Sequence, residues 1–488
     1  MIALRHTNLR LISRLLGMLL IIMACSMVLP IGVSVFYKDG SQYELILSTI
    51  AILLIGLLFR NILGHGANYE LRERESFWIT SAIWIVIPLA GTIPYLLTGT
   101  LTHFTDAAFE SYSGFTTTGS SVIVDLDFVP KGVLIYRSIS EWVGGLGLVL
   151  FVVALLKKLG VGSSQLYTAE FSGSLQRKLH PRMSTSVSRM WRLYLFLTLL
   201  LFAILVLLRN DVFTSFCVAI SAVSTGGFLP SNGALQQMTD ISLLVVAVFM
   251  LLSGINLALI YRLITGKGRM LWRDEEFRLF MSIFAVVTVV FTAAFFFNGD
   301  TLPHALGCSI FQVSSTMSTC GFYLTGAGSW PLVVKVIMFL LVIIGASAGS
   351  TGGGLKLKRL MILAKYVRNY FIRMLHPNAV LTVQISHEQI ETSYINKIFA
   401  FVFLYLAFLV GGAFILTFTG ISIPDALSLA AANIANLGPL PIAHSVGGVV
   451  NYAAIAPLAK WVLIVLMMVG RVEIFAIIAI FFPAYWKH

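Results

Sequence analysis

Charged residues are scarce in this chain, where they make up only 11% of 488 residues. Hydrophobic residues account for 58%, and the mean hydropathy is +0.91. An average soluble domain carries charge on roughly 25% of its residues. The scarcity of charge therefore argues against a water-soluble globular protein and indicates a chain that is buried in a lipid bilayer.

Cysteines and catalytic motifs are also scarce. The four cysteines lie in or beside apolar segments and lack the spacing of a metal site, so we interpret them as small buried thiols. The sequence contains no His-Glu-x-x-His motif and no Gly-x-Gly-x-x-Gly dinucleotide-binding motif. We therefore predict that the chain is not an enzyme and binds no cofactor of its own.

Apolar runs near 20 residues recur along the chain and predict an all-α, polytopic membrane protein. Most of the 33 Lys and Arg residues lie on the inner side if the N-terminus is cytoplasmic. This bias follows the positive-inside rule, so the net charge of +12 reports topology rather than binding to nucleic acid. We predict that both termini are cytoplasmic. The ten predicted spans lie near 12–34, 44–63, 78–98, 133–156, 192–208, 241–264, 279–297, 332–362, 395–418 and 456–483.

Four short segments share a pattern of small or polar residues that ends in glycine. Their last glycines follow one another at intervals of about 94 to 117 residues. Each segment follows a short half-apolar stretch and precedes a long apolar one, which is typical of an ion pore. Backbone carbonyls in such a filter replace the water around a dehydrated cation. The four segments are Thr116–Ser120, Ser224–Phe228, Ser318–Phe322 and Ala435–Pro439.

A short re-entrant helix is predicted before each segment. Each stretch opens on a residue that favours a helix start and is too short to span the bilayer. A helix that stops midway directs the negative end of its dipole at the filter, which favours a cation. The predicted starts are Thr105-Asp106, Asp211, Pro303 and Pro424-Asp425.

These elements divide the chain into four pseudosymmetric units of helix, pore helix, filter and helix around one pore, after two extra N-terminal transmembrane helices. The predicted boundaries are 1–76 for the N-terminal pair, 77–160, 189–268 and 277–365 for the first three units, and 393–488 for the fourth.

The third unit carries a glycine-rich interruption at Gly345–Gly354. Each glycine inside a helix costs about 1 kcal/mol relative to alanine, so we predict a break below the filter. One interpretation is an intramembrane gating loop, and the other is close helix packing through small residues. The residues expected to provide the gate are Gly345, Gly349, Gly352, Gly353 and Gly354.

Arg471 lies in the middle of the last predicted span, where a charge costs about 2.5–3.5 kcal/mol on insertion scales. We predict that it lies beside the pore and acts in gating, or else that it bonds carbonyls at a helix break. Glu110, Glu141 and Asn256 are weaker candidates, for bracing the filter or lining the cavity.

At these residues the chain resembles the Trk/Ktr/HKT superfamily of cation transporters, and its TrkH-type potassium uptake subunits in particular. The resemblance covers essentially the whole length. It implies potassium uptake across the bacterial cytoplasmic (inner) membrane, a homodimer with one pore in each chain, and a cytoplasmic nucleotide-binding regulatory subunit of the TrkA type. A secondary symporter that couples K⁺ to Na⁺ or H⁺ is the alternative.

The resemblance also implies the residues that bind K⁺. The fourth filter departs from the pattern because it has Asn436-Leu437 where the others have Thr and a small residue, so the ring is chemically asymmetric. The implied filter residues are Thr117, Thr118, Gly119, Thr225, Gly226, Gly227, Thr319, Cys320, Gly321, Asn436, Leu437 and Gly438.

Overall fold

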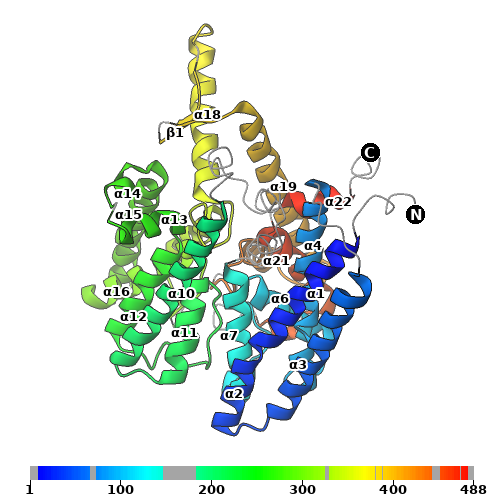
Figure 1. The fold of residues 1–488 in the computed structure, drawn as a ribbon. Helices are drawn as coiled ribbons and strands as arrows, with labels where there is room; N and C mark the ends of the chain where they lie inside the picture. The colour runs from blue at the N-terminus through cyan, green and yellow to red at the C-terminus, as the bar shows by residue number, and fades with distance from the viewer. Residues whose placement is uncertain are drawn as a thin grey trace.

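The computed structural model describes residues 9–65, 73–146, 183–266, 268–324, 329–379, 381–386, 388–441, 451–472 and 474–481. Within them the chain is almost entirely helical (Figure 1). Their only strands, β1 (Gln384–Ile385) and β2 (Glu388–Gln389), form one short antiparallel hairpin. The prediction of an all-α fold is confirmed.

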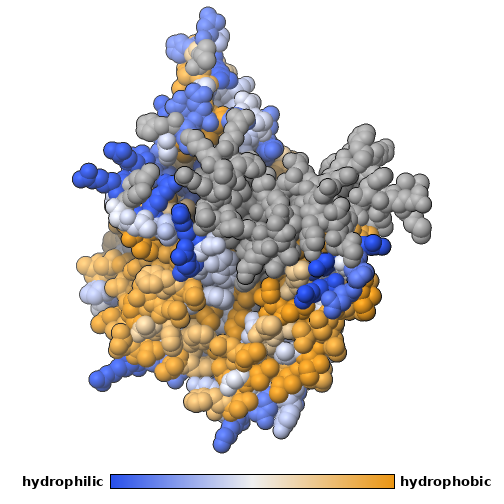
Figure 2. Space-filling view, viewed as in Figure 1, coloured by the Kyte–Doolittle hydropathy of each residue, from blue (hydrophilic) through white to orange (hydrophobic). Residues whose placement is uncertain are grey.

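Apolar side chains cover the body of the molecule as a broad belt, with hydrophilic residues gathered above and below it (Figure 2). Among the described residues, six helical stretches are long and apolar enough to cross a membrane, and a bent pair of helices could form a seventh span. Their composition matches the apolar runs of the sequence and supports a multi-pass protein. The six stretches are Leu9–Tyr37, Gln42–Leu63, Phe77–Leu97, Ser188–Leu207, Glu275–Phe297 and Thr392–Thr417.

The expected span 241–264 is not a single helix. It consists of α12 (Asp240–Ser253) and α13 (Leu257–Ile264), which are bent by 111°. Asn256 caps α13 by accepting a hydrogen bond from the N–H of Ala258 at 2.9 Å, and the carbonyl of Gly254 accepts one from Ser347 at 3.0 Å. Hydropathy does not register this break, because its polar groups have partners elsewhere in the fold, and the two helices together are still long and apolar enough to form one broken span.

Two of the later expected spans are also interrupted. The break predicted within 332–362 separates α17 (Leu332–Ile344) from α18 (Leu357–Leu375). The last span consists of α21 (Pro457–Arg471) and α22 (Ile474–Phe481). The span 133–156 begins as α7 (Lys131–Gly145), and its part beyond residue 146 lies outside the described residues.

The four predicted re-entrant helices are all present. The carboxylate of Asp211 caps the second by accepting a hydrogen bond from Thr214 N at 2.9 Å, and prolines occupy the first turns of the third and fourth. Their C-terminal halves are buried. The helices are α6 (Phe104–Phe115), α11 (Val212–Ser224), α16 (Leu302–Ser318) and α20 (Ile423–Ile434).

The same packing order recurs around the molecule. Each re-entrant helix packs against the long helix before it: α6 against α4, α11 against α10, α16 against α15 and α20 against α19. Each also packs against the helix that follows it, namely α7, α12, α17 or α21. The following helices then contact the next re-entrant helix: α7 contacts α11, α12 contacts α16, α17 contacts α20, and α21 returns to α6. The long helices are α4 (Glu73–Ala90), α10 (Met183–Leu207), α15 (Glu275–Phe297) and α19 (Thr392–Thr417).

The N-terminal helices lie outside this circle of packed helices. There α1 packs on α3 and α4, and α2 packs on α7. The helix α18 projects far beyond the apolar belt (Figure 1, Figure 2). The N-terminal elements are α1 (Leu9–Ser26), α2 (Val28–Tyr37), α3 (Gln42–Leu57) and the π-helix η2 (Leu58–Leu63). The remaining short helices are α5 (Ile93–Leu97), η3 (Leu126–Phe128), α14 (Arg269–Arg273) and η5 (Tyr452–Ala454).

Candidate ion pore

Each of the four segments leaves its re-entrant helix through the same backbone turn. A residue with positive φ precedes the last glycine by two positions, and that glycine also has positive φ. The residue between them donates its N–H to the carbonyl five positions earlier, as from Thr118 to Ser113 at 2.8 Å. A left-handed conformation costs a non-glycine residue about 1–2 kcal/mol, so the surroundings must hold these turns. The φ angles are 55° at Thr117, 57° at Thr225, 60° at Thr319 and 52° at Asn436, then 78° at Gly119, 94° at Gly227, 81° at Gly321 and 92° at Gly438.

The four glycines bring the segments together in one closed ring. An added Cβ at Gly227 would lie 2.5 Å from the carbonyl oxygen of Cys320, and one at Gly438 would lie 2.6 Å from that of Thr118. At the other two glycines an added Cβ would collide with a carbonyl oxygen of the next segment. The first segment therefore meets the second, the second the third, the third the fourth, and the fourth the first. These two collisions would be between Gly119 and the carbonyl oxygen of Gly226, and between Gly321 and that of Leu437.

All predicted filter residues lie in this ring, and the side chains of the non-glycine members are at most 2% exposed. Asn436, the departure in the fourth segment, has a structural part in the ring. Its side-chain amide donates to Thr118 Oγ1 at 3.0 Å and to the carbonyl of Met467 at 2.9 Å. It thereby ties the fourth segment to the first and to α21. Ion binding by the ring stays a prediction.

Glu141 braces the second segment from behind. Its carboxylate accepts hydrogen bonds from the N–H of Phe228 and from Ser221 Oγ, both at 2.8 Å. Ser221 Oγ in turn accepts the N–H of Gly227 at 2.9 Å. A buried carboxylate is costly unless such donors surround it, so Glu141 and the backbone beyond the turn stabilise each other.

Glu110 and Arg137 form a second brace, and sequence reasoning missed Arg137. Arg137 Nε donates to Glu110 Oε1 at 2.8 Å, and both side chains are at most 1% exposed. The guanidinium also bonds Ser121 Oγ at 3.1 Å and the carbonyl of Leu229 at 3.2 Å. The pair thus joins the chain just after the first segment to the chain just after the second. Arg137 lies near one end of the expected span 133–156, where hydropathy does not reveal a buried partner, and its spacing from Glu110 carries no signal.

We expect removal of one partner of this ion pair to destabilise the protein by about 3–5 kcal/mol, because the other charge is left buried and unpaired. The variants are Glu110→Gln, Arg137→Gln and the double substitution, and the measurement is thermal unfolding in detergent. The double variant should unfold at a higher temperature than Arg137→Gln alone. Strictly additive losses would contradict the pairing.

The glycine-rich segment lies against the ring rather than apart from it. The N–H of Gly353 donates to Thr319 Oγ1 at 2.7 Å. An added Cβ at Gly352 would collide with the carbonyl oxygen of Ser318, and one at Gly353 with that of Ala435. The segment therefore touches the third and fourth re-entrant helices where they end. Side chains at these glycines would not fit without displacing the backbone.

Positive φ angles shape the rest of this segment, at 72° for Gly345, 80° for Gly349 and 79° for Gly354. The carbonyl of Gly349 accepts the N–H of Leu257, so the segment is fastened to the break between α12 and α13. From the other side, Glu276 Oε1 accepts the N–H of Ala348 at 2.6 Å. The sequence predicted the break in the helix, but neither of these two partners.

Arg471 joins the glycine-rich segment to the first unit. One guanidinium nitrogen donates to the carbonyl of Thr351 at 2.8 Å, and the other to the carbonyls of Gly144 and Gly145 at 2.7 and 2.9 Å. The planar fork of arginine suits such divergent acceptors. These bonds agree with the expectation that Arg471 bonds carbonyls at a helix break, and its part in gating stays a prediction.

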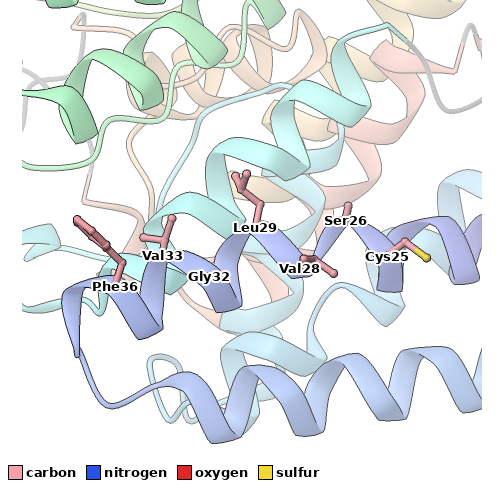
Figure 3. Close-up of a pocket in the computed structure, with 7 residues that line it drawn as sticks. All are labelled: Cys25, Ser26, Val28, Leu29, Gly32, Val33 and Phe36. Atoms are coloured by element: carbon pink, nitrogen blue, oxygen red, sulfur yellow. The ribbon is translucent and has the colours of Figure 1, made fainter.

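Two other features lack the context of a reactive or binding site. Gly345-Ala346-Ser347-Ala348-Gly349 matches the Gly-x-Ser-x-Gly spacing of a nucleophile elbow, but α17 rather than a strand leads into it. A groove of about 560 Å³ on α1 and α2 is lined almost entirely by apolar side chains such as Leu29 and Phe36 (Figure 3). Among the described residues, no group of three His, Cys, Asp or Glu residues could hold a metal ion.

The fold and the ring define a class: a helical membrane protein in which four re-entrant segments converge on one point. Comparison with known proteins agrees with this class. The TrkH family model, described as a cation transport protein, matches residues 41–488, and the chain belongs to that family. The family is one of cation transporters rather than of enzymes.

Full-length relatives support the assignment. The chain is 33% identical to the Trk system potassium uptake protein TrkH of Salmonella typhimurium and 32% identical to that of Escherichia coli K12, in each case over 98% of this chain and 99% of the relative. The crystal structure of the potassium transporter TrkH from Vibrio parahaemolyticus is similar, with a TM-score of 0.87 and 30% identity over 98% of this chain and 99% of that one.

Proposed function

We propose that this protein takes up potassium ions through the ring formed by its four segments. The closed ring of glycines and neighbouring carbonyls carries the proposal, because close-set backbone carbonyls can replace the hydration shell of a cation. The names of the full-length relatives, which are potassium uptake proteins, support the choice of ion. The four re-entrant helices also end at the ring, where their dipoles favour positive charge.

In this proposal the four units of helix, pore helix, filter and helix are related by pseudosymmetry around the pore. The recurrence of the same backbone turn and of the same packing order in each unit supports this pseudosymmetry. K⁺ is the transported ion rather than a cofactor, and the backbone and side chains of the predicted filter residues hold it.

Coupling to Na⁺ or H⁺ is not favoured. A coupling site in a membrane commonly uses carboxylates that can exchange a proton or an ion. Glu110 and Glu141 are the described carboxylates beside the ring, and hydrogen bonds to the backbone and to Ser or Arg side chains engage both. Glu473 lies outside the described residues.

The glycine-rich segment and Arg471 act as the gate in this proposal. The segment lies against the ends of the helices that carry the filter, and Arg471 joins it to the first unit through one bond to the segment and two bonds to the first unit. Opening requires the backbone to change conformation, and the glycines make that change inexpensive. The filter residues need not move, so selectivity is independent of the gate.

The protein resides in the bacterial cytoplasmic membrane with both termini inside, as the distribution of Lys and Arg supports. It forms a homodimer and works with a cytoplasmic nucleotide-binding subunit of the TrkA type. The projecting α18 (Figure 1) supports a partner, because its Tyr370, Phe371 and Leu375 are 57%, 59% and 77% exposed.

Purified protein in liposomes tests the ion specificity. We expect ⁸⁶Rb⁺ or K⁺ uptake that exceeds Na⁺ uptake, and that continues when the Na⁺ and H⁺ gradients are abolished. Uptake that stops without either gradient would support the symporter instead. Equal uptake of K⁺ and Na⁺ would contradict a K⁺-selective filter.

Purification from native membranes tests the partner. We expect a soluble nucleotide-binding protein to co-purify in mild detergent, and to be lost when Tyr370, Phe371 and Leu375 are changed to serine. Exposed apolar residues are the usual centre of an interface. Recovery of the chain alone, with full regulated transport, would contradict the need for a regulatory subunit.

A further inference from the structure

A second cavity lies between α1 and the end of α3, and none of its lining residues belongs to the ring. Its volume is about 410 Å³, and Arg14, Arg60, Asn61, Gly64 and His65 line it. Arg14 belongs to α1, and Arg60 and Asn61 to the π-helix η2 at the end of α3. Figure 2 shows a hydrophilic patch directly above the apolar belt on this side of the molecule.

Two glycine contacts hold the arginines at this cavity. An added Cβ at Gly17 would lie 2.5 Å from the backbone nitrogen of Arg60, and one at Gly64 would lie 2.7 Å from Cβ of Arg14. α1 and η2 therefore pack closely, backbone against backbone, at Gly17 and at Gly64. A π-helical turn is rare and is frequently found at functional sites. This packing places Arg14 and Arg60 in the lining of one cavity.

The chemistry of the lining favours a phosphate group. The lining offers two guanidinium groups, an amide and an imidazole, and it includes no carboxylate. Arginine binds phosphate through two parallel hydrogen bonds. Basic pockets between transmembrane helices at a membrane surface bind the headgroups of anionic lipids.

The neighbouring surface identifies the source of that phosphate. Leu54, Leu58 and Ile62 lie on the same helical stretch as Arg60 and are 60%, 45% and 67% exposed. They continue the apolar belt toward the cavity, so a ligand there meets a basic site and an acyl-chain surface together. We propose that this cavity binds the phosphate of an anionic phospholipid in the leaflet on the side of the N-terminus, with an acyl chain along these three residues.

Native mass spectrometry of the delipidated, full-length protein tests this proposal by titration with phosphatidylglycerol, phosphatidylcholine or inorganic phosphate. We expect preferential retention of phosphatidylglycerol. Each arginine near a membrane surface contributes about 1 kcal/mol, so Arg60→Gln should weaken binding about fivefold, and Arg14→Gln with Arg60→Gln about 25-fold. Arg60 is exposed, so its substitution leaves the packing of α1 intact. Arg60→Lys should retain part of the binding.

Arg262→Gln is the matched control, because Arg262 is an exposed arginine of α13 that does not line the cavity. It should bind phosphatidylglycerol like the unmodified protein. The proposal is overturned by equal retention of phosphatidylglycerol and phosphatidylcholine, or by unchanged retention in the double variant. Inorganic phosphate that binds as tightly as the lipid would identify a site for a soluble anion and overturn the lipid assignment.

Discussion

Replacement of Gly321 by alanine is expected to destroy the discrimination between K⁺ and Na⁺. The φ angle of 81° costs alanine about 1–2 kcal/mol. The added methyl would also collide with the carbonyl oxygen of Leu437, and overpacking of this kind costs about 1–3 kcal/mol. The third segment must therefore move away from the fourth. We expect the K⁺-over-Na⁺ uptake ratio in proteoliposomes to fall by about tenfold or more.

Gly307→Ala is the control for this experiment. Gly307 lies in the same re-entrant helix, α16, and an added Cβ there meets no atom within 4 Å. Alanine should raise the stability of the helix by about 1 kcal/mol and leave the uptake ratio unchanged. If Gly321→Ala folds and keeps the ratio of the unmodified protein, the ring is not the selectivity filter.

Replacement of Arg471 by alanine should raise the total K⁺ flux in the absence of any regulatory subunit. The substitution removes three hydrogen bonds from a charged donor to backbone carbonyls. Bonds of this kind contribute about 1.5–3 kcal/mol each. It also removes a positive charge from the vicinity of the path. Loss of a fraction of that energy suffices to raise K⁺ uptake into proteoliposomes about tenfold.

Arg471→Lys provides an intermediate case, because an ammonium group keeps the charge but lacks the planar fork that reaches both sides. Arg262→Ala, an exposed arginine outside the pore, should leave the flux unchanged. The K⁺-over-Na⁺ ratio should stay the same in all three variants, since the filter is separate from the gate. A second variant shortens the Gly345–Gly354 segment. If this variant and Arg471→Ala both fold but conduct no faster than the unmodified protein, the gate lies elsewhere.

The sequence by itself determined the class of fold, the four re-entrant helices and the break at the glycine-rich segment. These features are local: hydropathy selects lipid-buried helices, a carboxylate or proline starts a short helix, and clustered glycines end one. The spacing of the four segments also singled out the residues that form the ring. The boundaries of the pore units stay a prediction.

Only the tertiary structure decided which groups hold these elements in place. The ion pair of Glu110 with Arg137, the brace from Glu141 to Phe228 and the bonds from Arg471 to Thr351 and Gly144 join residues far apart in the chain. No local periodicity encodes such partners, because each buried polar group must find a donor or acceptor wherever the fold supplies one. The bend between α12 and α13 has the same cause, since its broken backbone bonds are replaced by contacts with a segment of the next unit.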